Sequence, residues 1–158
     1  MEKTRIIIVG RGGSGKNFLM GRMVERGMVP GILFTSRPPR EGEVDGVDYN
    51  FRSPDLFEFA HEEFYDLEMY NGWYYGILKK QFKKNDVFIM TPSGVSKIDP
   101  KDRANCFIIY LNPPREIIQE RLEQRNGMKD SVERRMLADD EDFRDFTDYD
   151  LLITNPYF

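Results

Sequence analysis

The chain has 158 residues, 40% of them hydrophobic, which suffices for one buried core. Its 23 Lys and Arg residues and 27 Asp and Glu residues give a net charge of −4, which excludes a general attraction to nucleic acid or to an anionic membrane. No apolar run reaches the roughly 20 residues that span a bilayer, and the acidic start of the chain lacks the regions of a signal peptide. We therefore expect a single cytoplasmic domain, a monomer or small homo-oligomer, with no nucleic-acid or membrane partner.

The pattern of apolar residues predicts alternating strands and helices. Buried strands are expected at residues 6–9, 32–35, 87–91, 107–111 and 151–154. Helices are expected to start near residue 16, to cover 56–63 after a Ser53-Pro54 start, and to cover 116–125 and 131–143, the last with a cap at Ser131. This order predicts an α/β fold, a three-layer parallel sheet that binds ligands at the carboxyl ends of its strands.

A glycine-rich segment follows the first predicted strand directly. It reads Gly10, Arg11, Gly12, Gly13, Ser14, Gly15, Lys16 and Asn17. In this spacing the glycines let backbone N–H groups wrap phosphate oxygens, and Lys16 neutralises charge between the outer phosphates, so a nucleoside triphosphate site is predicted. Asn17 stands where a Ser or Thr usually ligates Mg²⁺. Its amide oxygen is either a replacement ligand or a partner within the first turn of the helix.

A second phosphate site is predicted by residues 35–51, which read TSRPPREGEVDGVDYNF. Arg37 and Arg40 lie three residues apart around two prolines that stiffen the backbone, and Tyr49 adds a phenol. An arginine fork grips a phosphate with two N–H bonds, so these donors suit a phosphate monoester. The chain is therefore expected to bind a phosphorylated acceptor as well as a triphosphate donor.

Together the two segments resemble the guanylate kinase family of P-loop nucleoside monophosphate kinases, and the resemblance extends over residues 5–155. It implies a kinase core at residues 1–35 and 84–158, an acceptor-binding subdomain at 36–83, and a helical lid at 121–137. It also implies ATP as donor, Mg²⁺ as cofactor and a nucleoside monophosphate as acceptor. On this basis the chain is identified as a short and divergent member of the family.

The resemblance also assigns roles at the acceptor phosphate. Arg37, Arg40 and Tyr49 would bind it, with Glu43 in a supporting role. Tyr75, the second tyrosine of a Tyr-Tyr-Gly element, would reach the same phosphate.

At the donor end, the resemblance implies that the lid arginines Arg125 and Arg135 contact triphosphate oxygens, with Arg121 as a second choice. Asn155 would lie by the adenine. Transfer of a phosphoryl group through a loose transition state needs positive charge and positioning rather than a protein nucleophile. The residues expected to supply this catalysis are Lys16, Arg37, Arg125 and Arg135.

The base-binding end departs from the family. Asp66 aligns with the Glu that reads guanine, whereas the apolar Leu33 and Ile77 align with small hydroxyl residues that help to read it. The strand at 87–91 lacks the family's acidic residues and ends at Thr91, which either holds part of the substrate or caps the next turn. If Leu33 and Ile77 line the base pocket, guanine selectivity is weakened. If they are core residues, the pocket is unchanged.

The sequence therefore favours a nucleoside monophosphate kinase that transfers the γ-phosphoryl of ATP to GMP or dGMP, giving the diphosphate and ADP. A kinase for another base, such as a thymidylate-like or modified pyrimidine nucleotide, stays open because Leu33 and Ile77 are apolar. A non-catalytic guanylate-kinase-like module that binds phosphoproteins stays open because of Asn17 and the missing strand carboxylates. The carboxylates at residues 139–142 are interpreted as an outward acidic face of the second lid helix.

Overall fold

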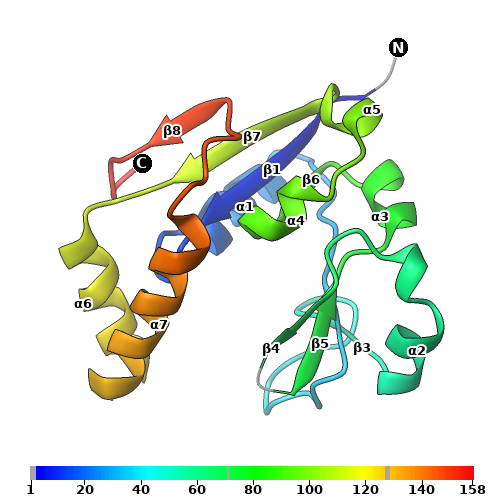
Figure 1. Cartoon of the computed structure of the whole chain (residues 1–158), viewed down its shortest axis with the longest axis horizontal. Helices are drawn as coiled ribbons and strands as arrows, with labels where there is room; N and C mark the ends of the chain where they lie inside the picture. The colour runs from blue at the N-terminus through cyan, green and yellow to red at the C-terminus, as the bar shows by residue number, and fades with distance from the viewer. Residues whose placement is uncertain (1–2, 71, 127–128) are drawn as a thin grey trace.

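A four-stranded parallel sheet forms the centre of the computed structural model, which describes residues 3–70, 72–126 and 129–158 (Figure 1). Its strands lie in the order β6 (Val87–Ile89), β1 (Arg5–Gly10), β7 (Cys106–Leu111) and β8 (Leu151–Ile153). Every neighbouring pair is parallel. The carboxyl ends of these strands therefore meet at one edge, where β1 leads into the glycine-rich loop.

Side chains alternate across this sheet, so each face has its own buried cluster. Ile7 and Val9 of β1 join one cluster, which extends to α4 (Pro92–Ser96) and to the end of α7 (Lys129–Phe143). Ile8 belongs to the other cluster, against which the apolar side chains of α1 (Lys16–Glu25) pack. These clusters give the parallel sheet a helix layer on each face, as the sequence predicts.

A second, mixed sheet lies below the parallel sheet, at the lower right of Figure 1. It contains β3 (Asn50–Phe51), β2 (Phe34–Thr35), β5 (Trp73–Gly76) and β4 (Glu68–Tyr70), in that order. The helices around it are α2 (Pro54–Phe59), the 3₁₀ turn η1 (His61–Glu63) and α3 (Lys79–Lys84). Phe57 of α2 stacks on Tyr74 of β5 with ring centroids 5.3 Å apart, and this aromatic contact ties α2 to the sheet.

Two helices, α6 (Arg115–Asn126) and α7, project from the other end of the parallel sheet, at the lower left of Figure 1. Their contact is a buried cluster made by Ile118, Leu122, Val132 and Met136. The joint predicted between them includes residues 127–128, which lie outside the described residues. None of the described helices has the length and apolarity needed to cross a membrane.

Two predictions about elements are wrong. The run at 32–35 does not join the parallel sheet: the side chains of Asn50 and Gln81 both donate to the carbonyl of Ile32, and the backbone N–H of Asn50 donates to the carbonyl of Leu33. The preceding Pro30 makes an isolated bridge to Val87 of β6, and the backbone N–H of Gly31 donates to the carbonyl of Val87. Ser131 does not cap α7, because this helix already begins at Lys129. By contrast, the predicted Ser53 cap of α2 is confirmed, since its side chain accepts from the N–H of Asp55.

Candidate active site

The glycine-rich loop joins β1 to α1 and wraps the N-terminus of that helix. Gly13 and Gly15 have φ values of +78° and +100°, in the left-handed region that favours glycine. Gly12 meets the lid: a Cβ there would lie 2.6 Å from Nε of Arg135. The loop thus presents backbone N–H groups at the positive end of α1, which is the arrangement that binds phosphate.

Lys16 lies folded over this loop. Its Nζ donates to the carbonyl oxygens of Gly10 at 2.5 Å and Arg11 at 3.4 Å. Burial lowers the pKa of the Lys16 ammonium to about 8; the charge of Asp139 opposes this shift, and those of Arg135 and Arg125 add to it. The positive charges of Arg125 and Arg135 are therefore close enough to Lys16 to repel its ammonium group. An anion bound among these three cations would relieve the repulsion.

Asp139 of α7 touches the phosphate-binding loop directly. Its Oδ2 accepts from the backbone N–H of Gly12 at 3.0 Å. The neighbouring Asp140 pairs with Arg115 at 2.9 Å and approaches Arg11 at 3.4 Å. The interpretation of residues 139–142 as an outward acidic face is therefore wrong for Asp139 and Asp140, whereas Glu141 and Asp142 are exposed as it expected. A donor phosphate at the N–H of Gly12 would displace the Asp139 carboxylate.

Two loop residues predicted to bind ATP turn away from the solvent. Arg11 donates to Oδ1 of Asn112 at 2.9 Å, and its guanidinium lies 5.3 Å from the centroid of the Phe143 ring. The hydroxyl of Ser14 is buried and has no hydrogen-bond partner among the described residues. Arg11 therefore fixes the loop against β7 and α7, while the backbone of the loop remains the phosphate-facing part.

A depression of about 440 Å³ opens beside the loop and includes both Arg121 and Arg125. Arg121 donates to the carbonyl oxygens of Gly13 at 3.1 Å and Pro156 at 2.7 Å, so it ties the loop to the last residues of the chain. The other lining residues are Gly13, Gly15, Phe18, Pro156, Tyr157 and Phe158. Asn155 is not among them; it is exposed, and its Oδ1 accepts from the N–H of Tyr157.

Residues 35–51, here called the acceptor loop, are organised by an ion pair between Arg37 and Glu43. Both guanidinium arms of Arg37 reach the Glu43 carboxylate, at 2.9 and 3.0 Å, and Glu43 also accepts from the backbone N–H of Arg40. These bonds hold the pKa of Glu43 at about 2, chiefly through the side chain of Arg37. The predicted supporting role of Glu43 is consistent with this geometry.

Aromatic rings complete the acceptor loop. The Arg37 guanidinium lies 5.2 Å from the centroid of Tyr49, and the rings of Tyr49 and Tyr75 meet edge to face with centroids 6.0 Å apart. Arg40 is exposed, and its side chain makes no hydrogen bond or ion pair within the described part of the chain. The loop and β5 together thus offer the guanidinium of Arg37, which Glu43 holds in place, the phenols of Tyr49 and Tyr75, and the unpaired guanidinium of Arg40. Tyr49 and Asn17 line the same depression of about 380 Å³.

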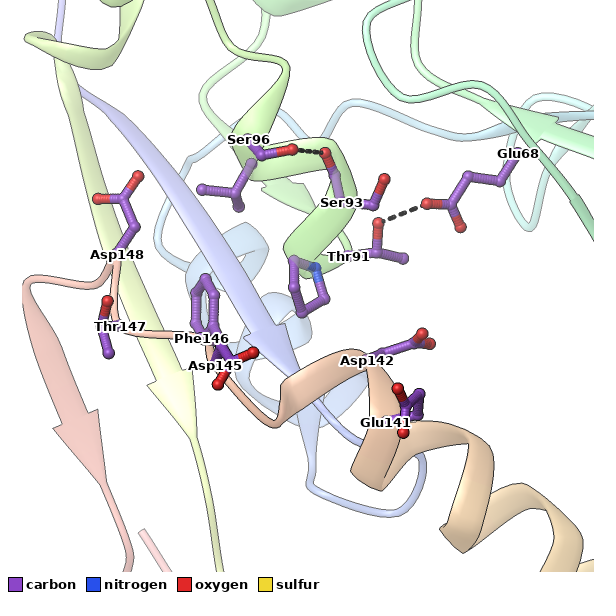
Figure 2. Close-up of a pocket in the computed structure, with 12 residues that line it drawn as sticks. Glu68, Thr91, Ser93, Ser96, Glu141, Asp142, Asp145, Phe146, Thr147 and Asp148 are labelled. Atoms are coloured by element: carbon purple, nitrogen blue, oxygen red, sulfur yellow. Dashed lines mark hydrogen bonds between the residues drawn. The ribbon is translucent and has the colours of Figure 1, made fainter.

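At the base-binding end, two carboxylates surround Thr91. Glu68 of β4 accepts from the Thr91 hydroxyl at 3.0 Å, as Figure 2 shows, and Asp66 accepts from the Thr91 backbone N–H at 3.4 Å. The same hydroxyl accepts from the N–H of Gly94, so Thr91 also caps α4. Desolvation raises the pKa of the buried Asp66 to about 6, and the charge of Glu68 adds to the shift.

Sequence reasoning does not identify Glu68 as a site residue. The structure places its carboxylate, from β4, beside Thr91 at the end of β6 and in the wall of the same cavity as Lys16. Asp66 and Glu68 are two residues apart, Asp66 in the bend that leads into β4 and Glu68 as the first residue of that strand, and both carboxylates accept from Thr91. That spacing is the signal that could have identified it.

The apolar residues Leu33 and Ile77 have different surroundings. Leu33 is half-buried and lines the cavity of about 170 Å³ that also contains Lys16, which agrees with one of the two alternatives from the sequence. Ile77 is fully buried in the main core cluster with Phe82 and Phe88 and does not line that cavity. Of the two alternatives for Ile77, the structure agrees with the core one: the residue comes directly after β5, and its side chain packs in the core rather than in the cavity.

One cavity of about 170 Å³ connects these parts. It is lined by Gly10, Gly12 and Lys16 from the loop, by Arg135, Asp139, Asp142 and Phe143 from α7, and by Leu33, Asp66, Glu68, Tyr75, Ile89, Met90, Thr91 and Pro92. The phosphate-binding loop, the lid and the acceptor side thus face one space. This arrangement, on a parallel α/β sheet, defines the fold and cleft of a P-loop nucleotide kinase.

Comparisons with known proteins agree. The family model described as guanylate kinase matches residues 2–158. The guanylate kinase of Histophilus somni is 32% identical over 96% of this chain and 80% of its own length, and that of Idiomarina loihiensis is 30% identical over 96% and 79%. The crystal structure of guanylate kinase from Anaplasma phagocytophilum matches 98% of this chain and 78% of that chain with a TM-score of 0.68; at 21% identity this likeness shows the fold.

The chain belongs to the guanylate kinase family. The resemblance and the fold class predicted from the sequence are both confirmed.

Proposed function

We propose that this protein phosphorylates GMP and dGMP, with ATP as the donor, and releases ADP. The observation that carries the proposal is the cavity that joins Gly12 and Lys16 of the P-loop to Tyr75 and Asp66 of the acceptor side. Direct transfer requires donor and acceptor phosphates in line within one water-poor space. Membership of the guanylate kinase family supports the same reaction.

For the donor, we propose that the triphosphate lies on the backbone N–H groups of the P-loop and that adenine occupies the depression beside it. Phe18 and Phe158, with ring centroids 6.1 Å apart and edge to face, offer an apolar surface there. Arg121 and Arg125 line the same depression and would balance the phosphate charge. In this pose Lys16, Arg125 and Arg135 stabilise negative charge on the transferring group.

The described residues contain no group of three or more His, Cys, Asp or Glu side chains that could hold a metal. Mg²⁺ in kinases is often held by one or two protein oxygens together with substrate phosphates and water. The side chain of Asn17 fits that requirement, since it is exposed in the first turn of α1 and lines the depression next to the acceptor loop. We propose that its amide oxygen holds Mg²⁺, which would neutralise phosphate charge when bound.

For the acceptor, we propose that Arg37, Arg40, Tyr49 and Tyr75 bind the phosphate of the monophosphate. Arg37 is fixed by Glu43, whereas Arg40 is free to close on the ligand. A bidentate arginine grip fixes orientation as well as charge. The attacking oxygen is thereby held in line with the γ-phosphoryl group, and no protein nucleophile is needed.

The base end favours guanine over the thymidylate alternative. The Watson–Crick edge of guanine presents N–H donors at N1 and N2 side by side, and Asp66 with Glu68 supplies acceptors for both. Thymine presents one N–H between two carbonyl oxygens, which these carboxylates would repel. The intact P-loop, with Lys16 inside the shared cavity, likewise favours an enzyme over a phosphoprotein-binding module.

We predict that GMP affinity depends on the ionised form of Asp66. Because the pKa of Asp66 is about 6, its carboxylate is retained at pH 7.5 and lost as the pH falls through 6. Asp66→Asn should weaken GMP binding by about tenfold to hundredfold at pH 7.5, the scale of a lost charge-assisted hydrogen bond. Calorimetric titration of GMP into wild type and variant, at pH 7.5 and pH 5, measures both effects.

The variant also serves as the control, because the GMP phosphate itself takes up a proton near pH 6 in both proteins. The loss of affinity from pH 7.5 to pH 5 should be about tenfold larger in wild type than in Asp66→Asn. Equal losses in the two proteins, or an unchanged affinity in the variant at pH 7.5, would show that Asp66 does not read the base.

A further inference from the structure

A basic depression lies at the end of the parallel sheet opposite the P-loop. Its volume is about 980 Å³, and Phe64 and Tyr65 form part of its wall. Figure 1 shows the N-terminal end of β1 close to α5 (Pro100–Arg103) and α3, far along the strand from the loop that follows Gly10. The depression shares none of its lining residues with the catalytic cavity.

Charge is concentrated in this depression. Two carboxylates, Asp99 and Asp102, line it. Six cationic side chains also line it, and one of them, Lys3, is paired with Asp86 outside the depression: Lys3, Arg5, Lys79, Lys83, Lys97 and Lys101. The chain as a whole carries a net charge of −4, so this excess of positive charge is local and opposite in sign to the rest of the protein. Such a concave patch attracts and concentrates small anions.

Arg5 is the second and independent observation. It is only 8% exposed, and its Nε and Nη1 have no hydrogen-bond partner among the described residues. The guanidinium lies 5.0 Å from the centroid of the Phe82 ring, which covers one of its faces. Asp102 accepts a short hydrogen bond from the Tyr65 hydroxyl and supplies no acceptor to those two nitrogens of Arg5. Buried arginine donors without an acceptor are costly, and an anion in the depression would satisfy them.

We propose that this depression binds a small, multiply charged phosphate compound, such as an inorganic polyphosphate or a phosphorylated metabolite, at a site separate from the catalytic cleft. Arg5 would grip one phosphate with its planar fork, and Lys79, Lys83 and Lys101 would surround the remaining charge. A concave site of this size suits a small ligand. A flat or protruding basic surface would instead suit a nucleic acid.

The depression also touches the connection between the two sheets. Tyr65 directly precedes Asp66, and its backbone N–H donates to the carbonyl of Ile77 at 2.8 Å. Lys79 Nζ lies 5.7 Å from the centroid of the Tyr65 ring. A ligand held by Arg5 and by α3 would therefore bridge the parallel sheet and the two chain segments that lead to the acceptor side.

Inorganic tripolyphosphate is the probe, titrated by calorimetry. Because the P-loop also binds phosphates, the Lys16→Ala protein is used throughout as the parent. Lys79→Gln/Lys83→Gln removes two lining charges from α3, and Lys80→Gln/Lys84→Gln removes two charges from the same helix outside the depression. The lining pair should weaken binding at least about tenfold and the control pair less than about threefold.

Arg5→Gln should abolish the same binding. If that variant does not fold, the two α3 pairs still decide the question. Equal effects of the two pairs, or no tripolyphosphate binding to the Lys16→Ala parent, would overturn the proposal. Binding of a single-stranded oligonucleotide, but not of tripolyphosphate, in a manner dependent on Lys79 and Lys83 would also overturn it, because the face would then be a nucleic-acid surface.

Discussion

Lys16→Ala is expected to lower the rate of phosphoryl transfer by about 10²–10³-fold while leaving the fold intact. Lys16 is the cation at the centre of the P-loop, and its pKa of about 8 reflects burial and the nearby lid arginines. A charge held in such an environment acts strongly on charge that develops on the transferring group. The turnover number for ADP release, with ATP and GMP both saturating, measures the loss.

Lys80→Ala is the matched control, since it removes the same charge from an exposed position on α3. Its turnover should stay close to that of wild type, and circular dichroism should report the same fold for both variants. If the Lys16→Ala protein turns over within threefold of wild type, Lys16 does not stabilise the transferring group, and the proposed mechanism fails.

Arg40→Ala is expected to lower kcat/KM for GMP by about tenfold to hundredfold, with a higher KM and a lower kcat together. Arg37 is already bound on both arms by Glu43, so the uncommitted guanidinium of Arg40 supplies charge that can move onto the acceptor phosphate. Loss of that contact both weakens binding and misplaces the attacking oxygen. Initial rates across a range of GMP concentrations separate KM from kcat.

Arg52→Ala is a suitable comparison for Arg40→Ala. Arg52 lies at the end of the same segment, and its guanidinium is bound to Asp45 at 3.1 Å on an exposed surface. It should leave GMP kinetics nearly unchanged, because a surface ion pair contributes little. Equal kinetics for Arg40→Ala and wild type would mean that residues 35–51 form a charged surface loop rather than a phosphate grip.

The parts of the site that could be predicted from the sequence are those whose chemistry is local. The P-loop between β1 and Lys16 needs only contiguous glycines and a lysine, and the Ser53 cap needs only its own turn. The acceptor loop is similar, since Arg37, Glu43 and Tyr49 contact one another within a short segment. In these cases the spacing of residues along the chain already determines which atoms can meet.

The parts that could not be predicted depend on contacts between distant segments. Ile77 aligns with a residue of the base pocket, but it comes directly after β5 and its side chain lies in the core. Glu68 reaches Thr91 only because β4 lies beside the start of α4. The sequence suggests that Asp139 belongs to a run of solvent-exposed charges. In the structure, however, α7 places its carboxylate where it accepts a hydrogen bond from the N–H of Gly12. Helical and strand registers are uncertain by a residue or more in a sequence, and that uncertainty decides whether each side chain faces the cleft.

The most direct test of the central claim is a coupled assay of ADP release from ATP with GMP, dGMP, AMP, dTMP, dUMP and dCMP as separate acceptors. We expect GMP and dGMP to be phosphorylated with kcat/KM values at least about 10²-fold above the others, because the carboxylates of the buried Asp66 and the half-buried Glu68 reject bases without matching donors. A preference for dTMP, or no acceptor-dependent ADP release with GMP, would contradict the proposed function.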